Sequence, residues 1–294
     1  WNCYFLDRKE LEFYHEVSEK LGEKRFKEVA SIDIGIVTGA NKFFCVAKED
    51  VDKWGFDRAN GYLEVLPMMG RSNEVAGLEF TKNDHSANSE RGKNCYFLRF
   101  DKGYKQTDLP HKLNMYLREG RRQELHKRYK CRIRKPWFWI PSVYPSELSM
   151  FKRASEFNRL IHNSAGAYTT DTVYRVRCLE NEDGVNARHL AFSFINSLTF
   201  LSCELEGRNY GGGVLELVPS EAERVFLPVY KCSDEEFSTL DGMLRDGVPI
   251  DEILDYTDSR IFHGKMGPRS LSNIRGSWRK LQQRRYVRGT SKGE

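Results

Sequence analysis

The sequence predicts an α+β fold, with a mixed or antiparallel sheet, flanking helices and a helical carboxy-terminal region. Ile32, Ile34 and Ile36 alternate with Asp33, Gly35 and Val37, which is typical of a strand. Residues 173–179 also have the composition of a strand. Residues 190–205 repeat apolar side chains at steps of three or four, which is typical of a helix. With 39% apolar and 13% aromatic residues the chain can build a core, so a disordered protein is excluded.

The net charge of +5 is modest, but the charges are unevenly distributed. Residues 118–138 contain nine Lys and Arg against two Glu, and residues 269–288 contain seven Lys and Arg and no acid. Residues 232–258 have the opposite bias, with nine acids and one Arg. Two basic blocks on an otherwise balanced chain suggest an anionic partner, of which nucleic acid is the commonest. The alternative is a pair of solvated helix faces.

The amino-terminal 48 residues predict one helix and two strands. Residues 1–26 carry a helical apolar stripe that Asp7 can cap, so we expect a connecting helix there. A strand follows over residues 32–36, and the apolar residues 43–46 predict a second strand.

A polar turn, residues 38–42, separates these two strands. It resembles a phosphate-binding Walker loop only superficially, because Lys42 follows an Asn and leads into an apolar strand. We expect a hairpin in which Thr38, Asn41 and Lys42 contact a backbone phosphate.

Short elements continue to residue 126. We expect a helix over residues 49–56, strands over 61–69 and 95–100, and a helix over 113–126. Residues 73–94 are polar and interrupted by glycines, which predicts a surface loop that could enter a groove and read bases.

The first basic block predicts a strand with one cationic face. Basic residues alternate with Cys131 and Ile133, and a proline then precedes Trp, Phe and Trp. Arg and Lys interleaved with aromatics are typical of phosphate contact and base stacking. We therefore expect Arg132, Arg134 and Lys135 to contact phosphates. The alternative is that the tryptophans are core residues and the basic side chains merely face solvent.

Residues 150–207 predict a weak helix, a strand and a strong helix. The weak helix covers residues 150–160. On the strand 173–179, Arg175 and Arg177 project to the same face and join the candidate DNA contacts. The helix over 190–205 is expected to end at Gly207 in a left-handed cap.

A glycine-rich turn follows that helix and precedes a short strand that Pro219 closes. Its residues are Arg208, Asn209, Tyr210, Gly211, Gly212 and Gly213. The Arg, Asn and Tyr suit a polar, anionic partner, and the three glycines would let a duplex approach closely. The alternative is a flexible hairpin loop.

Beyond residue 228 the chain is expected to be helical. Ser233 can cap an acidic helix through Leu244, Pro249 can start a second helix through Tyr256, and residues 271–288 predict a basic helix.

The cysteines and the hydropathy predict a reduced, cytoplasmic protein. There are seven cysteines, scattered and without a C-x-x-C spacing, so we expect free thiols and neither a disulfide framework nor a metal site. The sequence contains no apolar run long enough for a membrane span and no signal peptide. Because the first residue is Trp, we expect the chain to begin inside a longer protein.

Three segments carry a resemblance to a known family. They are DIGIVTGANKFFCV, IHNSAGAYTTDTVYRV and FINSLTFLSCELEGRNYGGGVLELVPSE, in this order. They resemble the carboxy-terminal half of the bacterial N6-adenine DNA methyltransferases of restriction–modification systems, in which the catalytic domain comes first and the target-recognition domain second. The opening WNCYFLDRKELEFY resembles the hinge that leaves the catalytic domain. The resemblance implies a hinge over residues 1–27, a target-recognition domain over 28–228 and a helical region over 229–294.

The catalytic motifs of that family are missing from the sequence. None of its nine prolines are adjacent, so the Asn-Pro-Pro-aromatic loop that holds a flipped adenine is absent, as is a glycine-rich loop for S-adenosylmethionine. We therefore expect no catalytic, cofactor or metal residues in these 294 residues. The expected function is sequence-specific binding of double-stranded DNA, with S-adenosylmethionine and methyl transfer belonging to an upstream or partner catalytic domain. The alternative is an interaction module that docks a separate methyltransferase or nuclease subunit through the acidic segment 232–258 and the basic tail.

Overall fold

Three small sheets and a set of helices form the part of the chain that the computed structural model describes, residues 2–22, 24–59, 61–180, 184–210 and 212–290. The α-helices are α1 (Arg8–Lys20), α2 (Asn41–Phe44), α3 (Lys48–Trp54), α4 (Lys82–Glu90), α5 (His111–Arg122), α6 (Tyr129–Arg132), α7 (Ala187–Ser193), α8 (Ser197–Glu206), α9 (Pro219–Ala222), α10 (Asp234–Arg245), α11 (Ile250–Ile261) and α12 (Pro268–Thr290). The strands are β1 (Ala30–Asp33), β2 (Cys45–Val46), β3 (Leu63–Met69), β4 (Tyr96–Phe100), β5 (Leu148–Phe151), β6 (Arg153–Ala154), β7 (Leu160–His162), β8 (Tyr168–Thr169), β9 (Val173–Cys178), β10 (Arg208–Tyr210) and β11 (Val214–Glu216). The predicted α+β class is confirmed.

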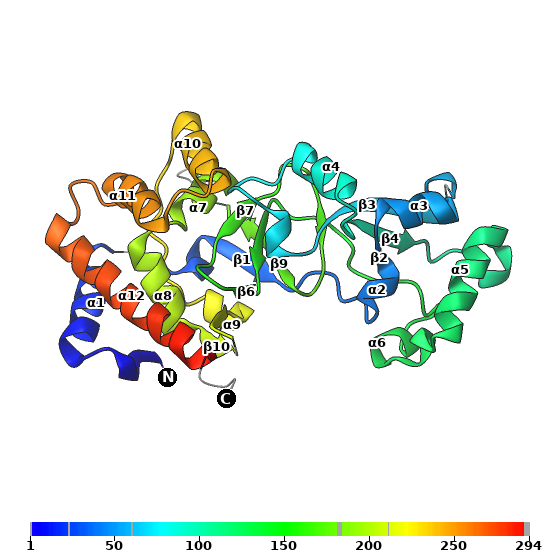
Figure 1. Cartoon of the computed structure of the whole chain (residues 1–294), viewed down its shortest axis with the longest axis horizontal. Helices are drawn as coiled ribbons and strands as arrows, with labels where there is room; N and C mark the ends of the chain where they lie inside the picture. Colours follow the sequence, from blue (N-terminus) through cyan, green and yellow to red (C-terminus); the bar gives the residue numbers. More distant parts are fainter. Residues whose placement is uncertain (1, 23, 60, 181–183, 211, 291–294) are drawn as a thin grey trace.

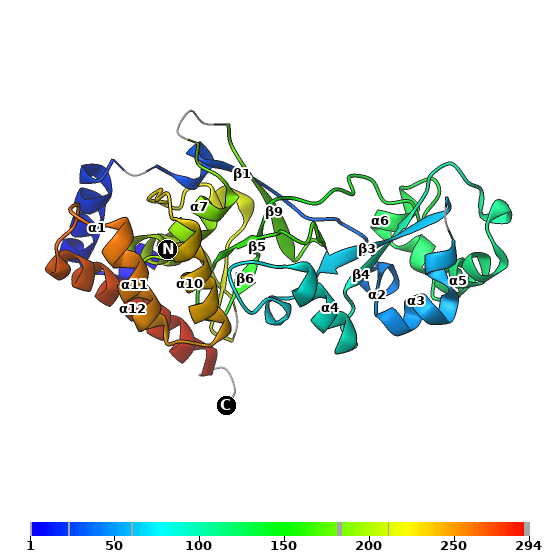
Figure 2. The same cartoon turned by 90° about the horizontal axis from the view of Figure 1, so that it is seen from above.

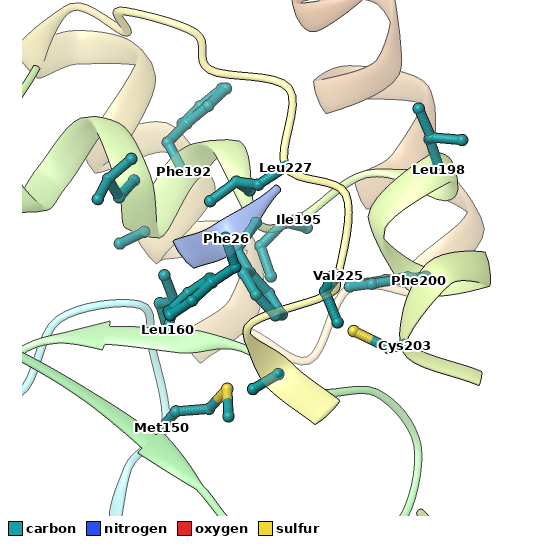
Figure 3. Packing of buried hydrophobic residues seen from close by; sticks show 14 of the residues in the cluster. Phe26, Met150, Leu160, Phe192, Ile195, Leu198, Phe200, Cys203, Val225 and Leu227 are labelled. Atoms are coloured by element: carbon teal, nitrogen blue, oxygen red, sulfur yellow. The ribbon is translucent and has the colours of Figure 1, made fainter. Parts of the chain in front are cut away.

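The helical lobe contains the largest core. Its sheet has the order β1-β9-β5-β7 with every neighbouring pair antiparallel, and helices α1 and α7–α12 gather around it (Figure 1). Phe26, Leu160 and Phe192 come from distant parts of the sequence and meet in this core (Figure 3). Tyr14 of α1 and Trp278 of α12 are buried in the same core, so both ends of the described chain fold onto one lobe.

The insert lobe lies at the other end of the elongated molecule (Figures 1 and 2). It is built from residues 34–147, which enter the sequence between β1 and β5. Its sheet has the order β2-β4-β3-β8, in which the edge strand β8 is supplied by the chain between β7 and β9 of the helical lobe. Phe44, Phe97 and Leu117 are fully buried in a core of its own, which α2, α3, α5 and α6 help to cover. A third sheet, with the order β10-β11-β6, belongs to the helical lobe.

The two lobes are joined by backbone pairing. The Ile36 N–H donates to the Thr169 carbonyl at 2.7 Å, and the Phe80 N–H donates to the His162 carbonyl at 2.8 Å. Gly35 is packed so tightly at this join that an added Cβ would lie 2.1 Å from the Thr170 carbonyl oxygen. The join therefore depends on a residue without a side chain.

An ion-pair network reinforces the join. Arg245 of α10 donates to Asp84 of α4 at 2.6 Å and to Asp241 at 2.6 Å. Asp241 in turn accepts the backbone N–H groups of Leu78 and Glu79. Burial by itself raises the pKa of Asp84, but hydrogen bonds from Arg245 and its helix cap outweigh burial and lower that pKa.

Several predicted helices and strands are confirmed. Asp7 and Ser233 each accept a backbone N–H in a capping box, at the starts of α1 and α10. The predicted strands 61–69, 95–100 and 173–179 correspond to β3, β4 and β9. In these segments the local signal and the tertiary packing agree.

The predicted hairpin over residues 32–46 is wrong. β1 ends at Asp33 and pairs with β9, whereas β2 pairs with β4 in the other lobe. The segment between them contains the short helix α2, and Phe43 and Phe44 are buried in it. Two short apolar runs close in sequence therefore belong to different sheets.

Two segments of the insert lobe, one basic and one polar, contain helices that were not expected. Residues 130–134, predicted as a strand with a cationic face, form α6 and the turn after it. Residues 73–94, predicted as a loop, contain α4, which Thr81 caps by accepting the Asp84 N–H. The capping box outweighs the loop-like composition of this segment.

Four predictions after residue 150 are also wrong. Residues 150–160 contain no helix but run from the end of β5 through β6 and an irregular stretch to the start of β7. The predicted helix 190–205 is divided at Asn196, which caps α8. Leu190, Phe194, Leu198 and Leu201 are buried as expected, and Leu205 is partly buried. Gly207 has φ −81°, so it is not a left-handed cap, and Pro219 begins α9 rather than closing a strand.

The ranges 1–27, 28–228 and 229–294 remain a prediction for domains. Among the described residues, no helix is both long enough and apolar enough to cross a membrane. All seven cysteines are free thiols.

Candidate nucleic-acid interface

Helix α6 is fastened to the segment that links the lobes. Cys131 is fully buried, and Arg134 donates to the carbonyls of Val37 at 2.5 Å and Thr38 at 2.8 Å. Gly39 has φ +79°, and an added Cβ there would lie 2.8 Å from the Lys130 Cβ. Because Gly39 has no side chain, α6 can pack closely against the turn of residues 37–39.

A groove of about 660 Å³ lies beside α6, and we call it the α6 groove. Its lining residues are Ile34, Gly35, Ile36, Val37, Lys102, Lys130, Ile133, Arg134, Lys135, Trp139, Pro141, Ser142 and Arg175. The walls are largely apolar, and Ile34 is 49% exposed and Ile133 59% exposed. Three lysines accompany them, of which Lys102 lies 4.7 Å from the Trp139 ring centroid. Apolar walls with lysines suit a partner that is both anionic and partly apolar.

The basic block that contributes to this groove is only partly neutralised. Arg122 pairs with Glu119 at 2.7 Å, and Lys127 pairs with Glu124. In contrast, Lys130, Arg132 and Lys135 have no carboxylate partner among the residues that the structure describes. Their positive charge is therefore available to an external anion.

Arg134 and Arg175 line the groove but are committed to the protein's own backbone. Arg175 is 7% exposed, and it donates to the carbonyls of Ser142 at 2.9 Å and Ile34 at 2.8 Å. Burial lowers the pKa of both arginines. Arg177, two residues along β9, is exposed and pairs with Asp33 at 3.3 Å. DNA contact by these side chains stays a prediction.

The turn of residues 38–42 is stabilised from within. Thr38 is buried, and its hydroxyl contacts the Asn41 side chain and accepts the Ala40 N–H at 3.0 Å. Asn41 donates to Asp171 at 3.2 Å, and Lys42 is exposed at a second hollow of about 380 Å³. Of the three residues predicted to contact phosphate here, Lys42 is the freest, because no ion pair within the described chain holds it.

The glycine-rich turn lies on the helical lobe, apart from the α6 groove. Arg208 pairs with the buried Glu221, and Tyr210 lies under Arg153, whose guanidinium is 3.9 Å from the ring centroid. Asn209 is exposed on β10, Gly211 lies outside the described residues, and Gly212 has φ +76° with open space around it.

The third glycine, Gly213, is packed against helix α12 of the same chain. A Cβ added at Gly213 would lie 2.8 Å from Tyr286 Cδ1, and the Gly213 carbonyl accepts a hydrogen bond from Arg285. The expectation that this glycine gives clearance for a duplex is therefore corrected. The absence of a side chain at Gly213 makes room for Tyr286 of α12.

The second basic block is neutralised inside the helical lobe. On α12, Arg275 pairs with Asp258 at 3.0 Å and Arg279 pairs with Asp251 at 2.9 Å, and both acids lie on α11. Lys280 pairs with Glu10 of α1 at 2.7 Å. The acidic segment and the basic helix thus bind each other, which leaves less of either charge for a partner.

The polar segment 73–94 uses some of its side chains internally. Asn88 is buried and donates to the Glu74 carbonyl at 2.8 Å. Asn83, Ser86 and Asn94 remain exposed on and beside α4. These amide and hydroxyl side chains are accessible to an external partner, as is the exposed Asn73 before the helix.

Replacing Arg134 tests whether its hydrogen bonds to the backbone hold α6 against the segment that links the lobes. We expect Arg134→Ala to lower the free energy of unfolding by about 1–3 kcal/mol, because two partly buried carbonyls lose their donors. Urea unfolding measures this. The neighbouring Lys135→Ala is the control, and it should change stability by less than about 0.5 kcal/mol. Equal stability of the two variants would contradict the role of Arg134.

Sequence reasoning missed part of the groove. The sequence pattern predicts strands at Ile34 and Ile133, and Lys102 has no local signal because it stands apart from the basic blocks. Lys130 lies in the first basic block, whose charge was the signal that could have found it. Trp139 is one of the aromatic residues that follow that block.

The chain matches known proteins over most of its length. The family described as "Type II methyltransferase M.Eco57I, C-terminal domain" matches residues 1–262. The chain is 21% identical to the type II methyltransferase M.AccI of Acinetobacter calcoaceticus over 229 residues, which are 76% of this chain and 39% of that protein. It therefore spans well under half of this relative.

Two solved structures are similar to the chain at low sequence identity. The type IIG restriction endonuclease BpuSI has a TM-score of 0.56 at 12% identity, over 96% of this chain and 34% of that one. The type IIL restriction-modification enzyme MmeI, solved in complex with DNA, has a TM-score of 0.46 at 12% identity, over 86% of this chain and 35% of that one. The likeness to BpuSI shows a shared fold. Because the family match covers most of the chain, the protein belongs to the family of the M.Eco57I type II methyltransferase C-terminal domain.

Proposed function

We propose that the chain binds double-stranded DNA sequence-specifically, as the target-recognition part of an N6-adenine DNA methyltransferase of a restriction–modification system. The family supports the methyltransferase and restriction–modification context. The observation that carries the proposal is the α6 groove and the helix beside it. Lys130 and Lys135 line the groove, Arg132 lies between them in the sequence on α6, and none of the three has a carboxylate partner within the described chain. Unpaired cations along an open groove are suited to backbone phosphates.

The proposal divides recognition between two kinds of contact. Lys130, Arg132 and Lys135 would fix the register of the duplex through phosphates. Base edges would be read by amide and hydroxyl side chains such as Asn83, Ser86 and Asn94 of the α4 segment. These donors and acceptors carry sequence information, which phosphate contacts do not.

Methyl transfer would belong to a different domain. The sequence has neither an Asn-Pro-Pro-aromatic loop nor a glycine-rich cofactor loop, and it spans 39% of M.AccI. We propose that S-adenosylmethionine binds an upstream or partner catalytic domain, which acts on the adenine that this chain selects. DNA as the partner implies a cytoplasmic location in a bacterium.

A charge-matched pair of variants tests DNA binding. Lys130→Ala/Lys135→Ala removes two unpaired cations, and Arg122→Ala/Lys127→Ala removes two cations of the same block that already have carboxylate partners. We expect the first variant to bind duplex DNA about tenfold more weakly at low salt, with a salt slope smaller by about 1.8. The second should keep both close to the wild-type values. Fluorescence anisotropy across a salt series measures affinity and slope.

Gel shifts with random duplex at low salt and retention on heparin separate DNA binding from the interaction module. A chain that neither shifts random duplex at low salt nor binds heparin favours an interaction module. Equal losses in both double variants would show that net charge, and not the α6 groove, governs binding.

A further inference from the structure

Ile133 is a large apolar side chain that stands exposed beside a rigid helix. It is 59% exposed, although Cys131, two residues earlier, is fully buried. Tyr129, at the start of the same helix, is 61% exposed. Single exposed apolar residues are normal on protein surfaces. Ile133, however, forms a wall of the α6 groove together with the half-exposed Ile34.

The backbone that carries Ile133 is held by the residue that follows it, Arg134. Arg134 donates to the carbonyls of Val37 and Thr38, and the Arg134 N–H donates to the Cys131 carbonyl at 3.0 Å. An isoleucine side chain is also stiff, because its branched Cβ restricts χ1. Ile133 is therefore a fixed apolar projection, and little conformational entropy is lost when a partner covers it.

Cations surround this projection. Lys130 and Lys135 line the same groove, and the Arg132 guanidinium lies 5.6 Å from the Tyr129 ring centroid. None of the three has a carboxylate partner in the described part of the chain. A surface with a central aliphatic side chain between cations matches a duplex, in which phosphates flank a groove and stacked bases form its apolar interior.

We propose that Ile133 inserts from the minor groove between two base pairs, unstacks that step and kinks the duplex, while Lys130 and Lys135 bind the flanking phosphates. This inference rests on the proposed function. Apolar wedges of this kind are used by proteins that bend DNA from the minor groove. The unstacking energy depends on the base step, so the wedge also contributes to sequence choice without a hydrogen bond to a base.

Plasmid DNA tests the wedge without knowledge of the recognition sequence. The plasmid is relaxed by a topoisomerase while saturated with the 294-residue chain, and the change in linking number per bound protein is measured. Gel shifts establish that each variant is compared at equal occupancy. We expect the wild-type chain to unwind the plasmid and Ile133→Ala to lose most of that change, because alanine is too short to separate base pairs.

Two further variants control for size and exposure. Ile133→Leu keeps a large aliphatic side chain and should retain the change. Met115→Ala truncates another exposed apolar residue of the insert lobe, 46% exposed on α5 and outside the groove, and should also retain it. Thermal unfolding of each variant establishes that it is folded.

The outcomes distinguish this inference from the proposed function. A chain that binds no duplex overturns both. A chain that binds DNA without unwinding it, or whose unwinding persists in Ile133→Ala, overturns the wedge and leaves DNA binding intact. Unwinding that is lost equally in Ile133→Ala and Ile133→Leu also overturns it, because a wedge requires bulk rather than one particular side chain.

Discussion

Glu204→Ala is expected to lower the free energy of unfolding by about 3–5 kcal/mol, because it leaves a buried guanidinium without its counter-charge. The Arg285 side chain is 0% exposed and that of Glu204 is 2% exposed, and they pair at 2.9 Å. Arg285 also donates to the carbonyls of Ser155 and Glu156 and of Gly213. The one arginine thus ties α12 to α8, to the residues after β6 and to the β10–β11 turn.

The environment of this pair explains the size of the expected loss. Burial raises the pKa of Glu204, and Arg285 opposes that shift. The carboxylate is therefore stabilised by its partner against a strong desolvation penalty, and neither charge can be hydrated once the other is removed.

A matched control lies two residues along the same helix. Glu206 pairs with Arg224 at 2.6 Å, with half of the Arg224 side chain exposed, and Glu206→Ala should cost less than about 1 kcal/mol. Urea unfolding of both variants provides the comparison. If Glu204→Ala costs no more than Glu206→Ala, the buried pair is not what holds α12 in place.

Gly35→Ala is expected to lower the free energy of unfolding by at least about 1–3 kcal/mol. We expect it to weaken DNA binding as well. The added Cβ would lie 2.1 Å from the Thr170 carbonyl oxygen and 2.5 Å from that of Val173. Both neighbours are backbone atoms next to β9, so no side chain can rotate away. The strain would fall on the Ile36–Thr169 hydrogen bond and on the wall of the α6 groove that residues 34–37 form.

Gly242→Ala is the control for this substitution. It lies on α10, and nothing is within 4 Å of an added Cβ, so the variant should be as stable as the wild type or slightly more stable. Melting temperature and duplex affinity are measured for both variants. A Gly35→Ala protein that melts and binds like the control would show that the join between the lobes is not tightly packed.

The candidate site could be predicted from the sequence only in part. The first basic block contributes Arg134 and Lys135 to the lining of the α6 groove, and Arg175 of β9 lines it as well. The roles of the arginines differ from the expectation, because hydrogen bonds to backbone carbonyls were not readable from charge alone. Lys102 reaches the groove only because β4 ends near α6 in the folded lobe.

The second basic block also shows that charge composition along the sequence does not predict which cations are free to bind a partner. Its composition suggested an anionic partner, yet α11 supplies Asp251 and Asp258 to α12. A count of charges along the chain cannot distinguish a free cation from a paired one. The pairing depends on which helices pack together, and that is decided by the apolar faces of the whole lobe.

By itself the sequence determined the α+β class, the starts of α1 and α10, the strands β3, β4 and β9, and the family resemblance. These features depend on residues within one or two turns, such as a cap and its partner or an alternating run. The tertiary structure alone decided that residues 41–44 and 129–132 are helical, that β1 and β2 belong to different sheets, and which cations stay unpaired at the α6 groove. These outcomes depend on contacts between residues far apart in the sequence, such as Cys45 with Phe97 and Asp33 with Arg175, and no local pattern encodes them.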